Sequence, residues 1–460
     1  MKRCFVGVIL RAILILAAFG GVAAAQSDGV VPDCTGNSAT DTASIVTIVS
    51  TLGTTNPATL RFPHKMCAVS DVTVPANVSV DLTGGYVRIE SGKSFTVKGQ
   101  IVAPAETQIF FNALPGQGTV TFSKPTVVHP EWWGARSNDD VEDTQAFQAA
   151  AKSLSGGVVK ISPGTFLITS TITLMQDSVQ LVGSGLYTSI ILCNPPTEMP
   201  CIDIKAPAAG GMISFVGVRD LGMLSTSLVT KHAIRITDGT EVFVENVRLN
   251  GFTSRNKQST GLQLRGRQLQ TFRNVTVNAD RPISIEDDPN TIYDVDHYHF
   301  ENLYLVADLQ QPCISVGTGV NLSNVTIDGY QSWVQCKHGF YYNDSTTKNI
   351  SFALTIKNAR WEQNVDDTGY FVYVSHNSNL DGIILENLYG GGVHGRGLYF
   401  RKAHKVTLTN FQYQGALEVL NADATDTDFV ILNPAWPNGK FNINTFGSYT
   451  SLPADVFRRQ

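Results

Sequence analysis

Acidic and basic residues crowd the stretch between residues 203 and 288, and their types suit chemistry on sugars. Glu286, Asp287 and Asp288 are consecutive, and Arg265 precedes them. Paired carboxylates can act as general acid and general base in the hydrolysis of a glycosidic bond. An arginine or lysine base beside carboxylates that hold Ca²⁺ could instead support β-elimination from a uronate.

A second cluster of reactive side chains is the sequence D-V-D-H-Y-H at residues 294–299. Two aspartates and two histidines within six residues could ligate a metal or supply acid and base groups. Their spacing matches no strong metal-binding motif, so no metal site is predicted. Asp296 and His297 are the members expected to point toward the charged residues.

These observations define two sets of candidate site residues. The candidate catalytic residues are Arg265, Glu286, Asp287, Asp288, Asp296 and His297. The candidate substrate-binding residues are Asp203, Lys205, Arg235, Arg267, Tyr341, Tyr399 and Arg401. The tyrosines are included because sugar rings stack on aromatic faces. The alternative is that pairs such as Arg265 and Glu286 are ordinary surface salt bridges, which contribute little to stability.

A recurring asparagine pattern indicates how these residues are positioned. Between Val242 and Tyr413 the order apolar, any, apolar, any, Asn, apolar, any, apolar occurs seven times, at spacings of 28, 28, 22, 34, 29 and 23 residues. Alternation with period 2 on each side of the asparagine predicts two strands that meet at a corner. Units of this length are typical of a solenoid whose coils stack strand on strand. The asparagines are Asn246, Asn274, Asn302, Asn324, Asn358, Asn387 and Asn410.

Each asparagine also serves as a register mark for the remaining strand of its coil. The asparagines themselves are expected to stack at a buried corner and to satisfy backbone groups there. Counting onward places two outward columns on a single face. One column is Asp203, Arg235, Gln263, Ser284, Ser315, Tyr341, Val372, Tyr399 and Glu418; the other is Lys205, Thr237, Arg265, Glu286, Gly317, Asn343, Val374 and Arg401.

The amino-acid composition bears on whether the protein binds nucleic acid. The chain has 460 residues, 43% of them hydrophobic, and a formal net charge of −5. Nucleic-acid binding needs a concentrated basic face, which this mildly acidic chain lacks, so no nucleic acid is expected as a partner.

The first 25 residues read as a secretory signal peptide. A basic start and an apolar stretch lead to Ala23-Ala24-Ala25, a small-x-small cleavage site. The apolar run is interrupted by Arg11 and is short for a membrane anchor, and no other segment predicts a membrane span. Export to an extracellular or periplasmic, oxidising compartment fits the six cysteines that remain after cleavage. Their fifteen possible pairings stay open, although in order they form near neighbours: Cys34 with Cys67, Cys193 with Cys201, and Cys313 with Cys336.

Four segments are expected along the chain. Residues 1–25 form the signal peptide, 26–127 an N-terminal β module that could be early coils of the same solenoid, 128–430 the solenoid, and 431–460 a C-terminal tail or cap. An amphipathic helix after Asp140 or Asp143, ending at Gly156-Gly157, is expected to cover the open first coil.

The residues from Glu131 to Leu192 carry a resemblance. The motifs W-W-G-A, D-T-x-A-F-x-A-A, G-G-V-V-x-I-x-P-G-T-F-x-I and V-x-L-x-G-x-G resemble the opening of the pectate-lyase-type right-handed parallel β-helix superfamily. Within that superfamily, the motifs are most similar to the branch that contains rhamnogalacturonase-like proteins, epimerase-like proteins and phage tailspikes. The resemblance implies three strands per coil, about nine or more coils, and a sugar chain bound along the outer face. It implies no single activity, because lyases, hydrolases, epimerases and adhesive proteins share the fold.

We therefore expect an all-β, right-handed parallel β-helix with an N-terminal capping helix. The expected function is a secreted polysaccharide lyase or glycoside hydrolase that cleaves an acidic or deoxy-sugar polysaccharide. The alternative is a non-catalytic glycan-binding or surface protein of the same fold. No cofactor is required, except that a lyase could use Ca²⁺, and the tailspike resemblance suggests a homotrimer.

Overall fold

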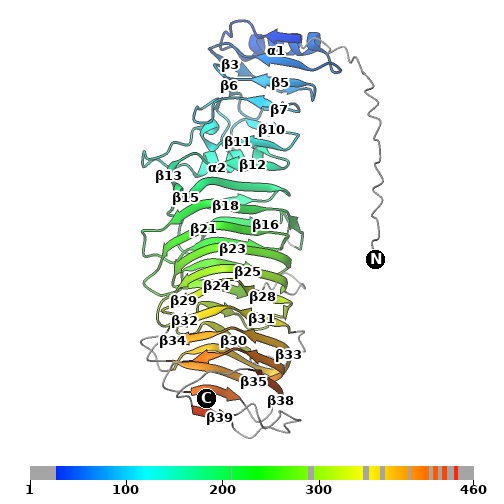
Figure 1. The fold of residues 1–460 in the computed structure, drawn as a ribbon. Coiled ribbons are helices and arrows are strands. Elements are labelled where there is room, and N and C mark those ends of the chain that lie inside the picture. Colours follow the sequence, from blue (N-terminus) through cyan, green and yellow to red (C-terminus); the bar gives the residue numbers. More distant parts are fainter. Residues whose placement is uncertain are drawn as a thin grey trace, which may run out of the picture.

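A computed structural model describes residues 27–208, 210–287, 295–344, 352–362, 368–391, 395–413, 418–422, 427–432 and 440–443. The chain forms a long parallel β-helix, with coils stacked in sequence order from the blue N-terminal end to the red C-terminal end (Figure 1). The all-β parallel helix expected from the sequence is thus confirmed. The segment expected to be a signal peptide, residues 1–25, lies outside the described residues.

The residues before 128 already form coils. Their strands make three small parallel sheets, one for each side of a three-sided coil. The first sheet contains β1 (Ser27–Val30), β2 (Ala58–Arg61), β5 (Val78–Asp81) and β8 (Ile101–Val102). The second contains β3 (Met66–Val69), β6 (Tyr86–Ile89) and β9 (Phe110–Phe111), and the third β4 (Val72–Val74), β7 (Ser94–Val97) and β10 (Thr119–Phe122).

Two helices flank or interrupt these coils. Helix α1 (Ser38–Leu52), which the sequence pattern did not reveal, lies across the N-terminal end of the described coils (Figure 1). Helix α2 (Thr144–Ser153) forms where a helix was expected and packs against β10, β14 (Ile172–Leu174) and the 3-10 helix η1 (Pro130–Trp133). Asp143 is its N-cap residue, but its carboxylate accepts hydrogen bonds from the backbone N–H of Arg136 and Leu167 instead. Neither described helix, at 15 and 10 residues, has the length and hydrophobicity needed to span a bilayer.

The later coils have three faces, each a ladder of parallel strands. The first face holds the candidate site strands: β14, β16 (Pro200–Lys205), β19 (His232–Thr237), β22 (Thr260–Arg265), β24 (Arg281–Glu286), β26 (Ile314–Val316), β30 (Phe340–Asp344), the starts of β33 (Tyr370–Glu386) and β35 (Arg396–Thr409), then β37 (Glu418–Ala422) and β39 (Lys440–Ile443).

Long strands bend through a corner and so contribute to both remaining faces. The second face holds β11 (Thr126–Val128), β12 (Gly157–Lys160), the starts of β15 (Val179–Cys193), β18 (Gly217–Leu224), β21 (Phe243–Phe252), β23 (Gln268–Ala279) and β25 (Val295–Val306), then β28 (Val325–Asp328), β31 (Leu354–Lys357), the ends of β33 and β35, and β38 (Thr427–Leu432). The third face holds β13 (Gly164–Ile168), the ends of β15, β18, β21, β23 and β25, then β29 (Gln331–Val334), β32 (Ala359–Glu362), β34 (Tyr389–Gly391) and β36 (Gln412–Tyr413).

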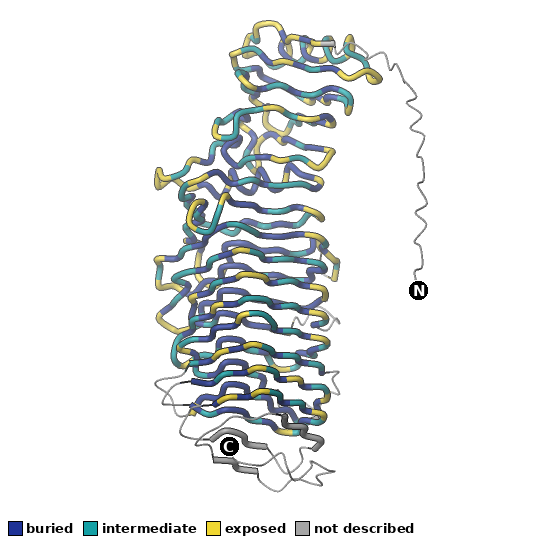
Figure 2. Tube along the Cα trace, viewed as in Figure 1, coloured by how far each residue is buried: buried dark blue, intermediate teal, exposed yellow. Residues whose placement is uncertain are grey.

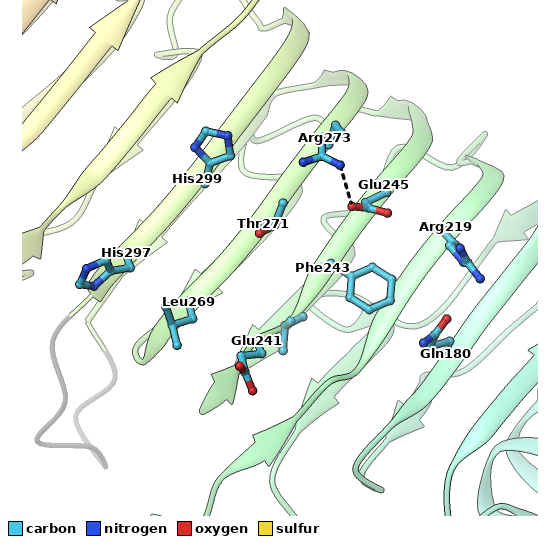
Figure 3. Close-up of a pocket in the computed structure, with 11 residues that line it drawn as sticks. Gln180, Arg219, Glu241, Phe243, Glu245, Leu269, Thr271, Arg273, His297 and His299 are labelled. Atoms are coloured by element: carbon cyan, nitrogen blue, oxygen red, sulfur yellow. Dashed lines mark ion pairs between the residues drawn. The ribbon is translucent and has the colours of Figure 1, made fainter. Parts of the chain in front are cut away.

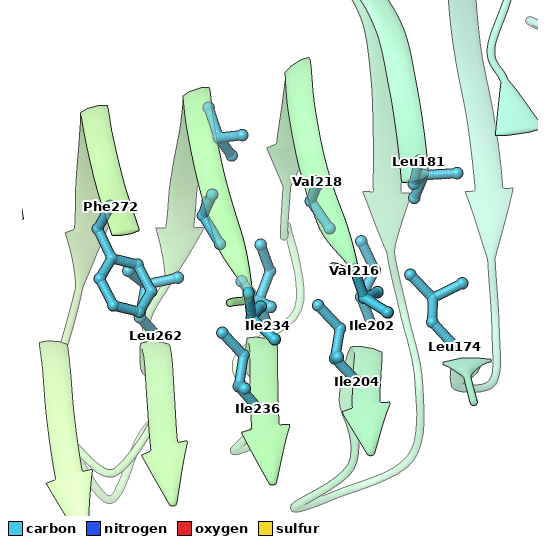
Figure 4. Close-up of a cluster of buried hydrophobic side chains, with 14 of the residues drawn as sticks. Leu174, Leu181, Ile202, Ile204, Val216, Val218, Ile234, Ile236, Leu262 and Phe272 are labelled. Carbon is cyan, nitrogen blue, oxygen red and sulfur yellow. The ribbon is translucent and has the colours of Figure 1, made fainter. Parts of the chain in front are cut away.

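The core is a set of inward columns that run along the helix axis. Ile202, Ile234 and Leu262 are each 0% exposed and occupy matching positions in successive coils. In Figure 4 they face side chains such as Val218 from the second face. Figure 2 shows buried residues along the strands and exposed ones gathered at the turns. Each fully buried aliphatic side chain stabilises the fold by about 1.5–3 kcal/mol, so the inward register is strongly specified.

The repeated asparagines mark the corner between the second and third faces. In this ladder the side-chain amide of Asn274 donates to Oδ1 of Asn246 at 2.9 Å, and that of Asn302 donates to Oδ1 of Asn274 at 3.0 Å. The same bond joins Asn387 to Asn358 and Asn410 to Asn387. All six have φ between 51° and 55°, the left-handed region that asparagine tolerates better than most residues.

Two expectations about this ladder were wrong. Its side chains lie on the outside of the corner, exposed or partly exposed, because left-handed backbone at the turn directs them outward. Asn324 is not a member, since it aligns with His297 at a different corner and donates to Asp296. Gly329 and Tyr330 stand at the ladder position in that coil, which explains why the irregular spacings 22 and 34 together equal two coils of 28.

Disulfides join the three near-neighbour cysteine pairs. The Cα atoms are 5.0 Å apart for Cys34 and Cys67, 5.9 Å for Cys193 and Cys201, and 5.3 Å for Cys313 and Cys336. These distances are ordinary for disulfides.

The ladder predicts a stability effect for Asn274→Ala. Alanine loses the amide bonds to both neighbouring coils and adopts the left-handed conformation unfavourably, so we expect the free energy of unfolding to fall by about 2 kcal/mol. Asn274→Gly should recover part of that loss, because glycine accepts the backbone conformation but makes no amide bond. Denaturant unfolding of the two variants measures the difference. A wild-type unfolding curve for Asn274→Ala would contradict a stabilising role for the ladder.

Candidate functional site

The first face brings eight of the thirteen candidate residues into two outward columns. The residues of the first column in successive coils are Asp203, Arg235, Gln263, Ser284, Ser315, Tyr341, Tyr373 and Tyr399. The expected outward positions of Val372 and Val374 were wrong, because Phe340 pairs with Val372 and both valines are 0% exposed. Tyr373 is the outward residue of that coil, and the stacked rings on either side of it maintain this register.

Asp203 is held by two cations at one end of the face. Arg235 donates from Nε and Nη2 to the two carboxylate oxygens of Asp203, each at 2.9 Å, and Nζ of Lys205 lies 3.1 Å from Oδ2. Burial alone would raise the pKa of Asp203, but the hydrogen bonds and charge of Arg235, with the charge of Lys205, hold that pKa below its usual value. Asp203 is therefore a fixed anion that orients Arg235.

Glu286 is likewise surrounded by donors. Arg265 donates from Nε and Nη2 to Oε2 at 3.0 and 2.9 Å, and Ser284 donates to Oε1 at 2.9 Å. The amide of Gln263 lies 3.1 and 2.9 Å from the two oxygens. Both carboxylate oxygens thus have partners within the protein.

The separation of these two acids does not match the geometry of a glycosidase pair. Asp203 and Glu286 lie on strands three steps apart, which is about 14 Å at the usual strand spacing. Hydrolases of this kind place their two carboxylates roughly 5–10 Å apart. Asp287 is exposed at the end of β24, and Asp288 lies outside the described residues.

His232 lies at the start of β19, beside these ion pairs. It is 9% exposed, and burial lowers its pKa to about 4, partly offset by the charge of Glu286. Nδ1 is buried and has no hydrogen-bond partner among the described residues. The imidazole is therefore neutral at pH 7.

A ladder of tyrosines occupies the other end of the face. The ring of Tyr373 stacks on Tyr341 at 5.0 Å between centroids and on Tyr399 at 4.5 Å, with interplanar angles of 26° and 7°. Beneath it, Nη1 of Arg396 donates to the hydroxyl of Tyr370 at 2.8 Å. Burial, with the neighbouring tyrosines, raises the pKa of Tyr373 to about 12. Sequence reasoning missed Tyr370 and Tyr373 because it placed the strand one residue out of register.

Small residues separate the ions from the tyrosines. Ser284 and Ser315 occupy the column between Gln263 and Tyr341, and Gly317 adjoins Glu286. Ser315 is too small to cover the adjacent ring face of Tyr341, while Tyr373 stacks on the ring at 5.0 Å and the imidazole of His338 packs against it at 4.7 Å between centroids. The first face therefore has a low step bounded by the Arg265 and Glu286 pair on one side and Tyr341 on the other.

The remaining candidate residues lie apart from this step. Arg267 is 7% exposed. Its guanidinium donates from Nε to Oδ1 of Asp238 at 3.2 Å and from Nη2 to the carbonyls of Gly210 and Gly211. Arg401 is exposed in the second outward column, beyond the tyrosines.

Asp296 and His297 lie at the corner between the first and second faces. Nδ1 of His297 is 2.8 Å from Oδ1 of Asp296. Burial opposes ionisation of Asp296, but hydrogen bonds from His297 and Asn324 lower its pKa. The expected contact between these two residues and the acids of β24 is not formed within the described residues, because the side chain of His297 points into a groove on the second face (Figure 3).

That groove is a feature that the sequence analysis missed. Outward residues of neighbouring strands on the second face line it, among them Arg219, Phe243, Glu245 and Arg273. The alternation F-V-E in β21 marks Phe243 and Glu245 as outward, which was the available signal. Among the described residues, no three His, Cys, Asp or Glu side chains are grouped closely enough to hold a metal ion.

Comparison with known proteins adds information about the fold. No protein-family model matches the sequence, and none of the curated proteins compared with it is similar. Solved structures are similar in fold. One is the A-module of mannuronan C-5 epimerase AlgE6 from Azotobacter vinelandii, at 13% identity and a TM-score of 0.41 over 70% of this chain and 100% of that module.

Two phage tailspike proteins are also similar to this chain in fold. The enzymatically active domain of bacteriophage CBA120 tailspike protein 2 has 14% identity and a TM-score of 0.42, over 70% of this chain and 47% of that one. The tailspike gp49 of Acinetobacter baumannii bacteriophage Fri1, a capsular polysaccharide depolymerase, has 14% identity and a TM-score of 0.38, over 72% of this chain and 65% of that one. The chain thus spans less than two thirds of either tailspike. The parallel β-helix fold that the resemblance implied is what the structure shows.

The neutral state of His232 predicts a pH dependence of stability. Its pKa in the folded chain, about 4, is below the ordinary value of about 6.5, so the unfolded chain binds more protons between those values. Stability should therefore fall as the pH drops from about 6.5 to about 4, by at most about 3 kcal/mol from this residue. We expect His232→Gln to show a smaller drop in thermal midpoint between pH 7 and pH 4.5. The exposed His64→Gln is the control, and an unchanged pH profile in His232→Gln would contradict the assignment.

Proposed function

We propose that the protein is a secreted, carbohydrate-active β-helix that binds an acidic polysaccharide along its first face. The observation that carries the proposal is the arrangement of that face: cation and carboxylate clusters, then a serine step, then a tyrosine ladder, on consecutive coils. A polymer lying along the helix axis would meet all three in order.

The charges favour an acidic ligand. Lys205, Arg235 and Arg265 stand over two carboxylates, Asp203 and Glu286, and Arg401 adds a further cation at the tyrosine end. With the exposed Asp287, the described candidate residues of this face are four cations and three carboxylates, and this excess of one cation would attract anionic groups. Arginine is suited to bidentate contact with a carboxylate, as its pairing with Asp203 illustrates.

The serine step provides a place for one sugar ring. The ring of Tyr341 next to Ser315 bounds the step, and the apolar face of a pyranose stacks on aromatic rings. Hydroxyl groups of the sugar would then lie near Glu286 and Ser284. We infer that the step orients the chain and that the flanking cations retain it.

Two forms of this function remain to be separated. The leading form is cleavage, by a lyase or a glycoside hydrolase. The candidate reacting groups are either Arg265 and Glu286 on the first face or Asp296 and His297 at its corner with the second face, two pairs that do not contact each other within the described residues. A lyase would use Ca²⁺ held by carboxylates. The second is a non-catalytic glycan-binding surface protein, and the pairing of Asp203 and Glu286 with arginine favours it. Export through the first 25 residues and assembly as a homotrimer belong to the proposal in either form.

Binding to the first face is tested with Tyr341→Ala and Arg265→Gln. We expect each to weaken retention on acidic polysaccharides by about tenfold, from loss of a stacking surface and of a cation respectively. Tyr304→Ala is the matched control, since Tyr304 is an exposed tyrosine (44%) on the third face. Equal retention of all three variants would rule out the first face as the binding surface.

Cleavage is tested by incubating the protein with a panel of polysaccharides. Release of reducing ends identifies a hydrolase, and absorbance of unsaturated uronates in addition identifies a lyase. We expect either Glu286→Gln or Asp296→Asn to abolish whichever product forms, and the inactive variant identifies which of the two pairs takes part. Full activity in both variants would show that the catalytic residues lie elsewhere, and binding without any product would establish the non-catalytic form.

A further inference from the structure

A groove of about 700 Å³ lies on the second face, around the corner from the serine step. We call it the Phe243 groove, after the residue at its centre. Strands β18, β21, β23 and β25 supply its walls, and Figure 3 shows Phe243 lying between Glu241 and Arg219. No described residue of the first-face strands lines it, whereas His297, at the corner between the two faces, does.

The ring of Phe243 lies over a glycine of the neighbouring coil. Gly217 pairs with Phe243, and a Cβ atom at Gly217 would come within 2.1 Å of two ring carbons. No other residue type would leave room for the ring there. Phe243 is partly exposed, so one face of the ring covers Gly217 and the other faces the groove, as Figure 3 shows.

The polar groups on either side of this ring differ from the paired charges elsewhere on the surface. Arg219 lies opposite Glu245 in the strand register, but no carboxylate is within 4 Å of its guanidinium among the described residues, and its Nε has no hydrogen-bond partner there. The carboxylate of Glu241 likewise makes no hydrogen bond or ion pair within the described part of the chain. Arg273, by contrast, is occupied by Glu245 at 3.6 Å and Glu301 at 2.7 Å.

This combination matches the chemistry of a sugar ring. A pyranose has an apolar face that stacks on an aromatic ring and a rim of hydroxyl groups that need hydrogen-bond partners. A carboxylate such as Glu241 accepts from hydroxyls, and an unpaired guanidinium such as Arg219 binds a carboxylate. A uronic acid offers hydroxyls and a carboxylate on the rim of one ring.

We propose that the Phe243 groove is a second glycan-binding site, which takes one uronic acid residue of an acidic polysaccharide. The sugar ring stacks on Phe243, its carboxylate binds Arg219, and its hydroxyls donate to Glu241. The inference shares with the proposed function only the class of ligand. It does not depend on binding at the first face.

The test uses the full-length protein and an array of immobilised acidic and neutral polysaccharides. We expect Phe243→Ala to weaken binding of the acidic glycans that the wild type retains by about tenfold. Arg219→Gln should reduce the preference for acidic over neutral glycans. Ile384→Ala is the matched control: it removes an exposed apolar side chain (43%) from the same face, outside the groove, and should bind as the wild type does.

The outcomes separate this inference from the first-face proposal. Wild-type binding by both Phe243→Ala and Arg219→Gln, with loss in Tyr341→Ala, overturns the groove and leaves the first face in place. Loss in the groove variants with none in Tyr341→Ala supports the groove and overturns the first face. Failure of the wild type to retain any acidic polysaccharide overturns both. If Phe243→Ala does not fold, Arg219→Gln, which changes only a surface polar group, decides the result.

Discussion

The constraint on which the structure depends is the common register of successive coils. Backbone hydrogen bonds run from each coil to the next, so every residue has a partner about 4.8 Å along the axis. Ile202, Ile234 and Leu262 fall in one inward column for this reason, and the outward residues fall into columns as well. Residues of one type at matching positions therefore form a continuous row along the helix axis, as in the tyrosine and asparagine ladders.

The same register governs charge. Like charges on neighbouring coils would repel at this spacing, and outward columns place acids beside bases instead: Glu245 with Arg273 on the second face, and Asp203 with Arg235 on the first. A charged residue on a strand face is consequently weak evidence for chemistry. A charged group that makes no short contact is stronger evidence. Arg219, although it lies opposite Glu245, forms no ion pair within 4 Å among the described residues, and Glu241 forms none either; both lie beside an aromatic ring.

Period-2 alternation predicted the coils and the strand face that carries Arg265, Glu286 and Tyr341. It could do so because inward positions of a strand are apolar and outward positions are mostly polar. Alternation did not reveal where a corner falls, since several residue types adopt left-handed backbone. Asn324 was therefore assigned to the wrong corner, and a run of apolar residues around Val372 allowed a one-residue error. The Phe243 groove needs Gly217 one coil away, and no local pattern connects residues 217 and 243.

The aromatic residues on the two faces present different surfaces. In the tyrosine ladder, Tyr373 is covered on both sides by stacked rings, so it offers its ring edge and hydroxyl, while Tyr341 stands next to the small Ser315. Phe243 has no hydroxyl, and its ring lies against the sheet with one face outward. Stacking on the first face is thus confined to the boundary with the serine step, while the rest of the ladder can only donate and accept hydrogen bonds. A polysaccharide would be gripped at a single ring on each face, and the polar groups around those two rings would determine which sugar it accepts.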